Sequence, residues 1–230
     1  MVQNLDKNIK IIHFKNEEKQ NPFSLEWNYF IFESYLKKID FKSLSKFLLK
    51  KKKDILKLPT SFDNTRQSDG LTGLGNDSTT ARFKHYNVLN WKNKNIVLIK
   101  KAIRMLHNEA LNQLNLPVPE EIYIQCWVNI MNKGEKIKCH SHGYTPNIYL
   151  GGHICVQCDN TSTYYVNPVQ QLDIAYTYKS KNEIGKITMF QGHLPHYTDE
   201  HNTEKERITL AFDIVTDPNV LITDKHYIKI

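Results

Sequence analysis

Four residues whose types and spacing suit metal chemistry stand out in this chain. His140 and His142 flank one serine, His196 follows 54 residues after His142, and Arg207 stands eleven residues beyond His196. Positions i and i+2 of a β-strand point to the same face, so His140 and His142 would present two imidazoles together. A third imidazole from a distant segment would complete a site that suits Fe(II), Zn or Cu. We therefore predict that His140, His142 and His196 are metal ligands and catalytic residues.

Arg207 points to a small acid bound beside this metal. Arg207 and Thr209 are two residues apart and would share a strand face, while the opposite face carries Ile208, Leu210 and Phe212. A buried arginine is costly unless it is paired, and a bidentate carboxylate together with the threonine hydroxyl would satisfy it. A salt bridge to an acidic residue of the protein is the alternative.

Other uses of these residue types compete with the metal site. The chain has ten histidines, so a chance His-x-His is not rare, and either His193 or His196 could face the site. Cys155 and Cys158 form a single Cys-x-x-Cys, which raises zinc or redox chemistry. On a strand, however, positions i and i+3 face opposite ways, and no second such pair follows. We therefore favour the histidine site.

The second half of the chain must supply the scaffold, because its residues follow a two-residue period and are rich in β-branched and aromatic types. Seven strands are predicted, at 122–131, 136–142, 148–157, 163–167, 173–178, 186–191 and 207–215. Short strands with turn residues between them favour a sandwich, barrel or jelly roll. The fold class is therefore mainly β.

Two helices are predicted in the first half. Asp40 is a good N-cap for a helix over 41–57, and a second apolar stripe predicts a helix over 95–115, closed by Pro117. Between them, 61–80 is a polar loop that is either disordered or a lid. We predict a single domain, 1–230, with a helical and loop support region (1–117), a β core (118–216) and a C-terminal extension (217–230).

Composition narrows the class of protein. No apolar run reaches the ~20 residues that span a bilayer, and four cysteines in 230 residues are no disulfide framework. We expect a cytoplasmic protein without a membrane partner. The net charge of +7 includes a lysine run at 50–53. That run favours a solvated face, with nucleic-acid binding as the less favoured use.

The combined pattern resembles a known family over about 121–216. It includes Trp127-Val128-Asn129-Ile130 through Gly134, His140-x-His142, Gly151-Gly152, Tyr165-x-Asn167-Pro168, Gly185-x-Ile187-x-Met189-Phe190, His196 and Arg207-x-Thr209. These residues resemble the 2-oxoglutarate/Fe(II) oxygenases found in phages and marine bacteria, relatives of the prolyl 4-hydroxylases. The resemblance implies a double-stranded β-helix, a jelly-roll or cupin-like core.

The resemblance also implies roles for single residues. His140 and His196 would bind iron, and Arg207 with Thr209 would bind the far carboxylate of 2-oxoglutarate. Asn129 and Tyr149 are further candidates for contact with this co-substrate. His142 departs from the wider superfamily, which has Asp or Glu at that place, so it either binds iron or leaves a coordination position open.

The expected function is an Fe(II)- and 2-oxoglutarate-dependent dioxygenase, in outcome a hydroxylase, that uses O2 and converts 2-oxoglutarate to succinate. A phage-encoded enzyme of this kind would act in the host cytoplasm, on a small-molecule or peptide substrate that the sequence does not identify. Two alternatives remain: a metal-binding jelly-roll protein without oxygenase activity, and a basic nucleic-acid-binding or virion-associated interaction protein.

Overall fold

The computed structural model describes residues 4–6, 8–15, 18–19, 21–24, 26–62, 67–143, 149–167, 176–217 and 226–230. In chain order, the elements are β1 (Lys10–Lys15), β2 (Asn28–Tyr35), α1 (Phe41–Ile55), η1 (Thr80–His85), η2 (Val88–Asn90), α2 (Lys94–Gln113), β3 (Tyr123–Met131), β4 (Leu150–Gln157), β5 (Ser162–Val166), β6 (Thr177–Lys181), β7 (Lys186–Gln191), β8 (His196–Thr198), β9 (Arg207–Val215) and β10 (Ile228–Lys229). Among these residues, no helix is both long and apolar enough to cross a membrane.

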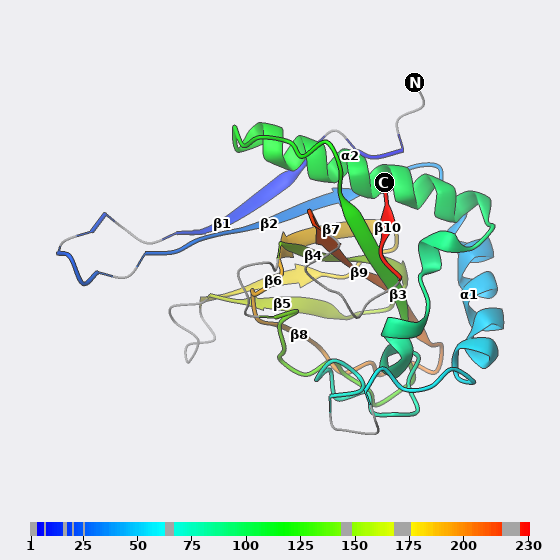
Figure 1. Ribbon diagram of the computed structural model, residues 1–230. Helices are drawn as coiled ribbons and strands as arrows, with labels where there is room; N and C mark the ends of the chain where they lie inside the picture. The colour runs from blue at the N-terminus through cyan, green and yellow to red at the C-terminus, as the bar shows by residue number, and fades with distance from the viewer. Residues whose placement is uncertain are drawn as a thin grey trace.

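Two antiparallel sheets form the β core (Figure 1). Within the described residues, the large sheet has the order β1-β2-β7-β4-β9-β3-β10 and the small sheet has the order β6-β5-β8. A small cluster of Ile31, Tyr165, Phe190 and Leu194 packs where the sheets face each other. From β3 onward the chain passes repeatedly between the sheets, which is the winding of a double-stranded β-helix. The predicted fold class is confirmed.

The two helices cover the outer face of the large sheet, as Figure 1 shows for α2. Asp40 caps α1 by accepting a hydrogen bond from the backbone N–H of Ser43, and Asn93 caps α2 in the same way through Asn95. Each helix buries one apolar stripe, with Leu44 and Leu48 on α1 and, on α2, Ile96, Ile99, Ile103 and Leu106. Both predicted helices are confirmed, with ends within two residues of the expected ones.

Successive side chains of β9 alternate between the face that packs under the helices and the face that lines the site. Ile208, Leu210, Phe212 and Ile214 join the core under the helices. Arg207, Thr209 and Ala211 take the opposite face and line a cavity between the sheets. The strand therefore presents its polar residues where a ligand can reach them, as the two-residue period predicts.

One predicted strand is wrong. Residues 136–142 form no strand, because their backbone hydrogen bonds with 192–198 are irregularly spaced and Lys138 bonds to Thr72 instead. Lys138 N donates to Thr72 O, His140 exchanges two bonds with His196, and His142 N donates to Gly192 O. Only the pair His140–His196 has the geometry of a β-bridge. The two histidines of the motif are thus fixed by separate partners and not by one strand.

Four strands were not predicted: β1, β2, β8 and β10. The run Tyr29–Phe32 in β2 is continuously apolar, without the alternation that marks a half-buried strand. The strands β8 and β10 have only three and two residues. The expected strand over 173–178 falls partly outside the described residues, and β6 follows it at Thr177–Lys181. The division into 1–117, 118–216 and 217–230 stays a prediction.

Candidate metal centre

Three imidazoles converge between the two sheets. Their ring centroids lie 4.4 Å apart for His140–His196, 5.1 Å for His142–His196 and 5.8 Å for His140–His142. One ligand atom from each residue can be chosen so that all three lie within 4.8 Å of one another. The β-bridge between His140 and His196 sets the first pair, and the bond from His142 N to Gly192 O adds the third. All three predicted ligands therefore meet at one point.

Each ring nitrogen Nδ1 of this triad already has a partner in the protein. Nδ1 of His140 lies 2.8 Å from Lys138 O, and Nδ1 of His196 lies 3.0 Å from Leu194 O. Nδ1 of His142 contacts Oδ1 of Asp213. Because these acceptors hold a proton on Nδ1, the other nitrogen, Nε2, carries the free lone pair on every ring. The triad is thus oriented for ligation before any metal arrives.

Burial keeps the imidazoles of His140 and His196 neutral. It lowers the pKa of His140 to about 4, and the nearby His142 adds to that shift. Burial also lowers the pKa of His196 well below the usual value for histidine, and His140 contributes again. A metal binds only the unprotonated nitrogen, so at neutral pH these rings do not have to lose a proton before they bind. This donor set fits a divalent transition metal such as Fe(II).

Of two adjacent glycines, Gly151 makes room for His142 and Gly152 makes room for Phe212. A Cβ on Gly151 would lie 2.7 Å from Nδ1 of His142, and one on Gly152 would lie 2.3 Å from the ring of Phe212. The imidazole therefore lies directly over the backbone of β4, with the ring of Phe190 edge-on at 5.6 Å. Any larger residue at position 151 would push the ring out of place.

Arg207 is the most deeply buried cation near the triad, with 1% of its surface exposed. Its Nη1 lies 3.0 Å from Met131 Sδ, and its buried Nε has no hydrogen-bond partner. Among the described residues, no carboxylate forms a salt bridge with it. The alternative of an ion pair within the protein therefore finds no support there. An isolated buried charge is costly, so Arg207 requires an anion that the described residues do not provide.

A cavity of about 40 Å³ joins the triad to Arg207. Thr209 and Asn129 line it with them, and the carbonyl oxygen Oδ1 of Asn129 accepts a hydrogen bond of 2.7 Å from the hydroxyl of Thr80. This bond fixes the amide group of Asn129 toward the site. The structure thus places Arg207, Thr209 and Asn129, the predicted co-substrate residues, in one cavity with the three histidines.

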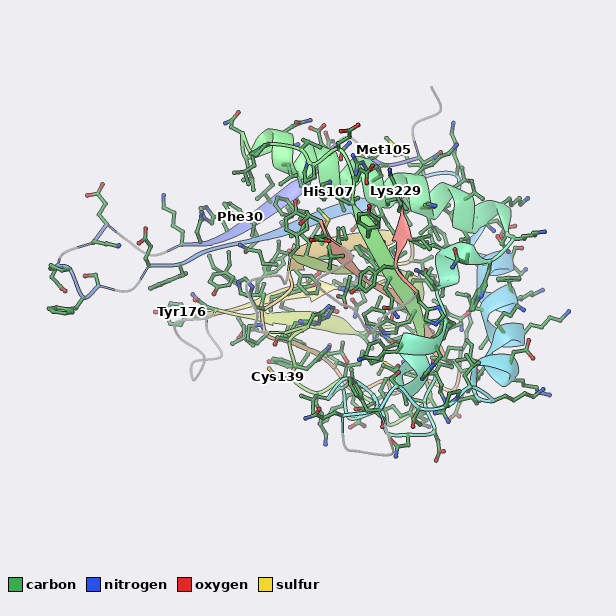
Figure 2. All side chains as sticks on the ribbon, viewed as in Figure 1. Phe30, Met105, His107, Cys139, Tyr176 and Lys229 are labelled. Carbon is green, nitrogen blue, oxygen red and sulfur yellow. The ribbon has the colours of Figure 1, made fainter. Side chains whose placement is uncertain are left out.

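Tyr149 lies elsewhere. It lines a second cavity of about 220 Å³ together with Phe62, Phe83, Gln125 and Tyr227, and its hydroxyl lies 3.0 Å from Nε2 of His107. Figure 2 shows His107 on α2, on the other side of the large sheet from β5. The described geometry therefore does not bring Tyr149 to the predicted co-substrate cavity. His142 lines both cavities, so the two adjoin at its ring.

Two histidines outside the triad have other positions. His153 lines the first cavity, where burial and the nearby Arg207 lower its pKa to about 3. His193 packs edge-to-face on Tyr29 at 5.1 Å, so it is His196 that faces the site. The pair Cys155 and Cys158 is coupled by a hydrogen bond between the thiols, which leaves the pKa of Cys155 raised and that of Cys158 lowered. Neither cysteine belongs to the triad.

The sequence analysis missed Asp213, whose carboxylate holds His142. The signal was present, because Asp213 continues the alternation of Arg207 and Thr209 along β9. What the sequence did not supply was its partner, which lies 71 residues earlier.

Comparison with known proteins shows which family this core resembles. Residues 125–213 match the family described as "Putative 2OG-Fe(II) oxygenase". The predicted resemblance to 2-oxoglutarate/Fe(II) oxygenases is confirmed, and the phage or marine bacterial type stays a prediction. The matched segment runs from β3 to β9 and contains all three histidines, Arg207 and Asp213. Fe(II), 2-oxoglutarate and O2 are the cofactor and co-substrates that this family implies. No protein with curated annotation matches the chain.

Solved structures show a wider likeness. An oxidoreductase of the 2OG-Fe(II) oxygenase family from Burkholderia pseudomallei is 12% identical, with a TM-score of 0.42, 52% of this chain covered and 59% of that one. A Pseudomonas putida prolyl-4-hydroxylase is 11% identical, with a TM-score of 0.43 and coverages of 55% and 67%. A prolyl hydroxylase from Trichoplax adhaerens, solved with a peptide fragment of hypoxia inducible factor, is 8% identical, with a TM-score of 0.43 and coverages of 57% and 61%. The chain thus spans about three fifths of the length of the first of these proteins.

Proposed function

We propose that this protein is an Fe(II)- and 2-oxoglutarate-dependent oxygenase acting on a substrate still to be identified. The observation that carries the proposal is the juxtaposition of three imidazoles with a buried arginine that has no anion among the described residues. The imidazoles provide ligands for a metal, and the arginine provides the counter-charge for a small acid beside it. Neither the three imidazoles nor the arginine alone would specify 2-oxoglutarate as the co-substrate.

His140, His142 and His196 hold the iron in this proposal. Three protein ligands leave open positions on an octahedral metal for a chelating acid and for dioxygen. Bound there, Fe(II) with 2-oxoglutarate and O2 supplies an oxidative decarboxylation that yields succinate, carbon dioxide and an oxidant for the substrate. The protein contributes the orientation of the three rings through their Nδ1 partners.

Arg207 and Thr209 bind the far carboxylate of 2-oxoglutarate. The guanidinium has a buried, unpartnered Nε, and Thr209 lies two residues along the same face of β9. Hydrogen bonds between an arginine and a carboxylate are the strong, charge-assisted kind, and burial strengthens them further. The side-chain amide of Asn129, held by Thr80, lines the same cavity and is a third contact.

The substrate occupies the second cavity, on the far side of His142 from Arg207. Its walls combine four phenylalanine and tyrosine rings with the aliphatic side chains of Leu150, Ile214 and Val215, so they offer apolar contact beside the metal. We expect hydroxylation as the outcome and a small molecule or a peptide as the substrate. Phage origin and a cytoplasmic location remain part of this proposal.

The turn at 67–80 belongs to the site in this proposal. Asp69 accepts hydrogen bonds from the backbone N–H groups of Leu71 and Gly75, and the hydroxyl of Thr79 donates to Val128 O at 2.7 Å. Thr72 then lines the first cavity. The described part of this loop is therefore held against β3, where we expect it to limit access to the metal.

One observation favours a second candidate function. The described triad contains three histidines and no carboxylate, whereas the usual iron oxygenase set has two histidines and one acid. A metal-binding jelly-roll protein without oxygenase activity would use the same triad for Zn or Ni. The unpaired Arg207 weighs against it, because a metal-only site has no use for a buried cation.

The test is Fe(II)-dependent formation of succinate from 2-oxoglutarate under O2. We expect activity in the native chain, loss in His196→Ala and retention in His193→Ala. The last variant is a matched control, because it removes a histidine three residues away that packs on Tyr29. A chain that binds metal through the triad but neither binds nor consumes 2-oxoglutarate would instead establish the jelly-roll alternative.

A further inference from the structure

The three histidines of the triad differ in what holds them. His140 and His196 are each held by a backbone carbonyl two residues before them in the chain. His142 alone is held by a charged group, the carboxylate of Asp213, 71 residues away. The first two acceptors are local consequences of chain direction, whereas the third depends on the tertiary fold. His142 is therefore the exception among the three histidines.

Asp213 is placed for this contact by β9 and its two neighbouring strands. Its partners in the sheet are Gln125 on β3 and Gly151 on β4. Because Gly151 has no side chain, the imidazole of His142 fits over it and reaches the carboxylate. The side chain of His142 is 9% exposed and that of Asp213 is 25% exposed. The pair is thus largely shielded from solvent, where a charge acts strongly on its neighbour.

A carboxylate behind a metal-binding imidazole changes what that imidazole contributes. It fixes the proton on the far nitrogen, holds the ring plane and makes the near nitrogen a stronger donor. Three neutral imidazoles would leave the full charge of a divalent ion on the site. A unit of negative charge one hydrogen bond away compensates for much of it.

We infer that Asp213 is the carboxylate of this metal centre, acting through His142 instead of binding the metal itself. Asp213 is thus a positioning residue, and the site is a three-histidine set with its acid displaced to the outside of one ring. This inference rests on the proposed function, since it assumes a metal on the triad. The inference goes beyond the proposed function by assigning the missing negative charge to Asp213.

Two other roles for the carboxylate make different predictions. If Asp213 were itself a ligand, its removal would weaken metal binding even without His142. If the pair were only a structural ion pair, its removal would lower the stability of the metal-free protein and leave the metal affinity of the folded protein unchanged. The described geometry disfavours the direct-ligand role, because the cluster of close ligand atoms includes the three histidines and not Asp213. The experiment decides between the structural ion pair and the positioning role.

The experiment is a double-mutant cycle read out by the affinity of the whole chain for Co(II), measured by competition with a chromophoric chelator. Asp213→Asn keeps the size of the side chain and removes its charge. We expect it to weaken Co(II) binding about 10- to 100-fold, the usual cost of losing such a partner. In a His142→Ala background, the same change should have almost no further effect. The Co(II) absorption spectrum of D213N should also shift, since one donor has changed.

Controls separate the outcomes. Glu121→Gln removes another paired carboxylate, one bonded to Lys229 and Tyr123, and should leave Co(II) affinity unchanged. Thermal unfolding of metal-free D213N checks that the fold persists. If D213N does not fold, Gly151→Ala provides a second route, because the added Cβ moves the ring of His142 away from Asp213. We expect about a tenfold loss of affinity in G151A.

Three results would overturn the inference. D213N, or G151A in its place, could bind Co(II) as tightly as the native chain. D213N could lose affinity equally with and without His142, which would make Asp213 a direct ligand. Finally, the native chain could bind no metal, and then the proposed function fails with the inference. Tight binding by the native chain with unchanged D213N would reject the inference alone.

Discussion

The two ends of β9 carry opposite charges at the same site, and only one of these charges has a partner among the described residues. At one end, Arg207 is buried and has no anion among the described residues. At the other end, six residues along the same face, Asp213 is paired with His142. An unpaired buried charge destabilises the empty protein, so it marks a place where a ligand binds. A paired buried charge, such as that of Asp213, is part of the ligand-free structure and orients a residue that binds the metal. The difference separates the co-substrate side of the site from the metal side.

The largest expected effect comes from the metal that lies between these ends. His196→Ala removes a ligand that no other described residue can replace. We expect succinate formation to fall to background and the Co(II) affinity to fall more than in D213N, because a lost ligand costs more than a lost neighbour of a ligand. Equilibrium Co(II) binding checks the order of the two variants. Equal losses would mean that Asp213 contributes as much as a ligand does.

Arg207→Met is the variant that distinguishes the Arg207 end of β9 most clearly from the Asp213 end. Loss of charge-assisted hydrogen bonds worth about 1.5–3 kcal/mol should weaken 2-oxoglutarate binding roughly 10- to 100-fold. The metal-free protein should become more stable by about 1–3 kcal/mol, because an unsatisfied buried charge is gone. Chemical denaturation and titration with 2-oxoglutarate measure the two quantities. A destabilised R207M would show that Arg207 has a structural partner.

Added metal should stabilise the native chain more than D213N at the same concentration. A ligand that binds only the folded state stabilises it by about 2.7 kcal/mol at a hundredfold excess over its Kd. If D213N binds 10- to 100-fold more weakly, that gain should shrink by about 1.3–2.3 kcal/mol. Thermal unfolding with and without Co(II) measures the difference. H193A serves as the control, with an undiminished gain.

The smallest expected effect is that of Thr80→Val. This change removes the hydroxyl that donates to Asn129 Oδ1. We expect a loss of about 1 kcal/mol in the free energy of unfolding, typical of one buried hydrogen bond. Affinity for 2-oxoglutarate should fall only a few-fold, because Asn129 keeps its place on β3. Unchanged co-substrate affinity, measured beside R207M, would remove Asn129 from the binding site.

Much of this arrangement could be predicted from the sequence through local rules. The caps and apolar stripes located both helices, because a helix is determined by residues a few positions apart. The two-residue period along β9 put Arg207 and Thr209 on one face. The same rule failed for 136–142, because these residues bond irregularly to 192–198 and to Thr72 and form no continuous strand.

The sequence by itself determined which residues could form a metal site and an anion site, since residue type and spacing are local properties. The tertiary structure decided which groups hold them. It set His142 against Asp213 across 71 residues and over Gly151, and it left Arg207 beside Met131 with no anion among the described residues. Those partners depend on how distant strands pair and how the sheets pack. Contacts of this range arise from burial of the whole chain, and no short stretch of residues encodes them.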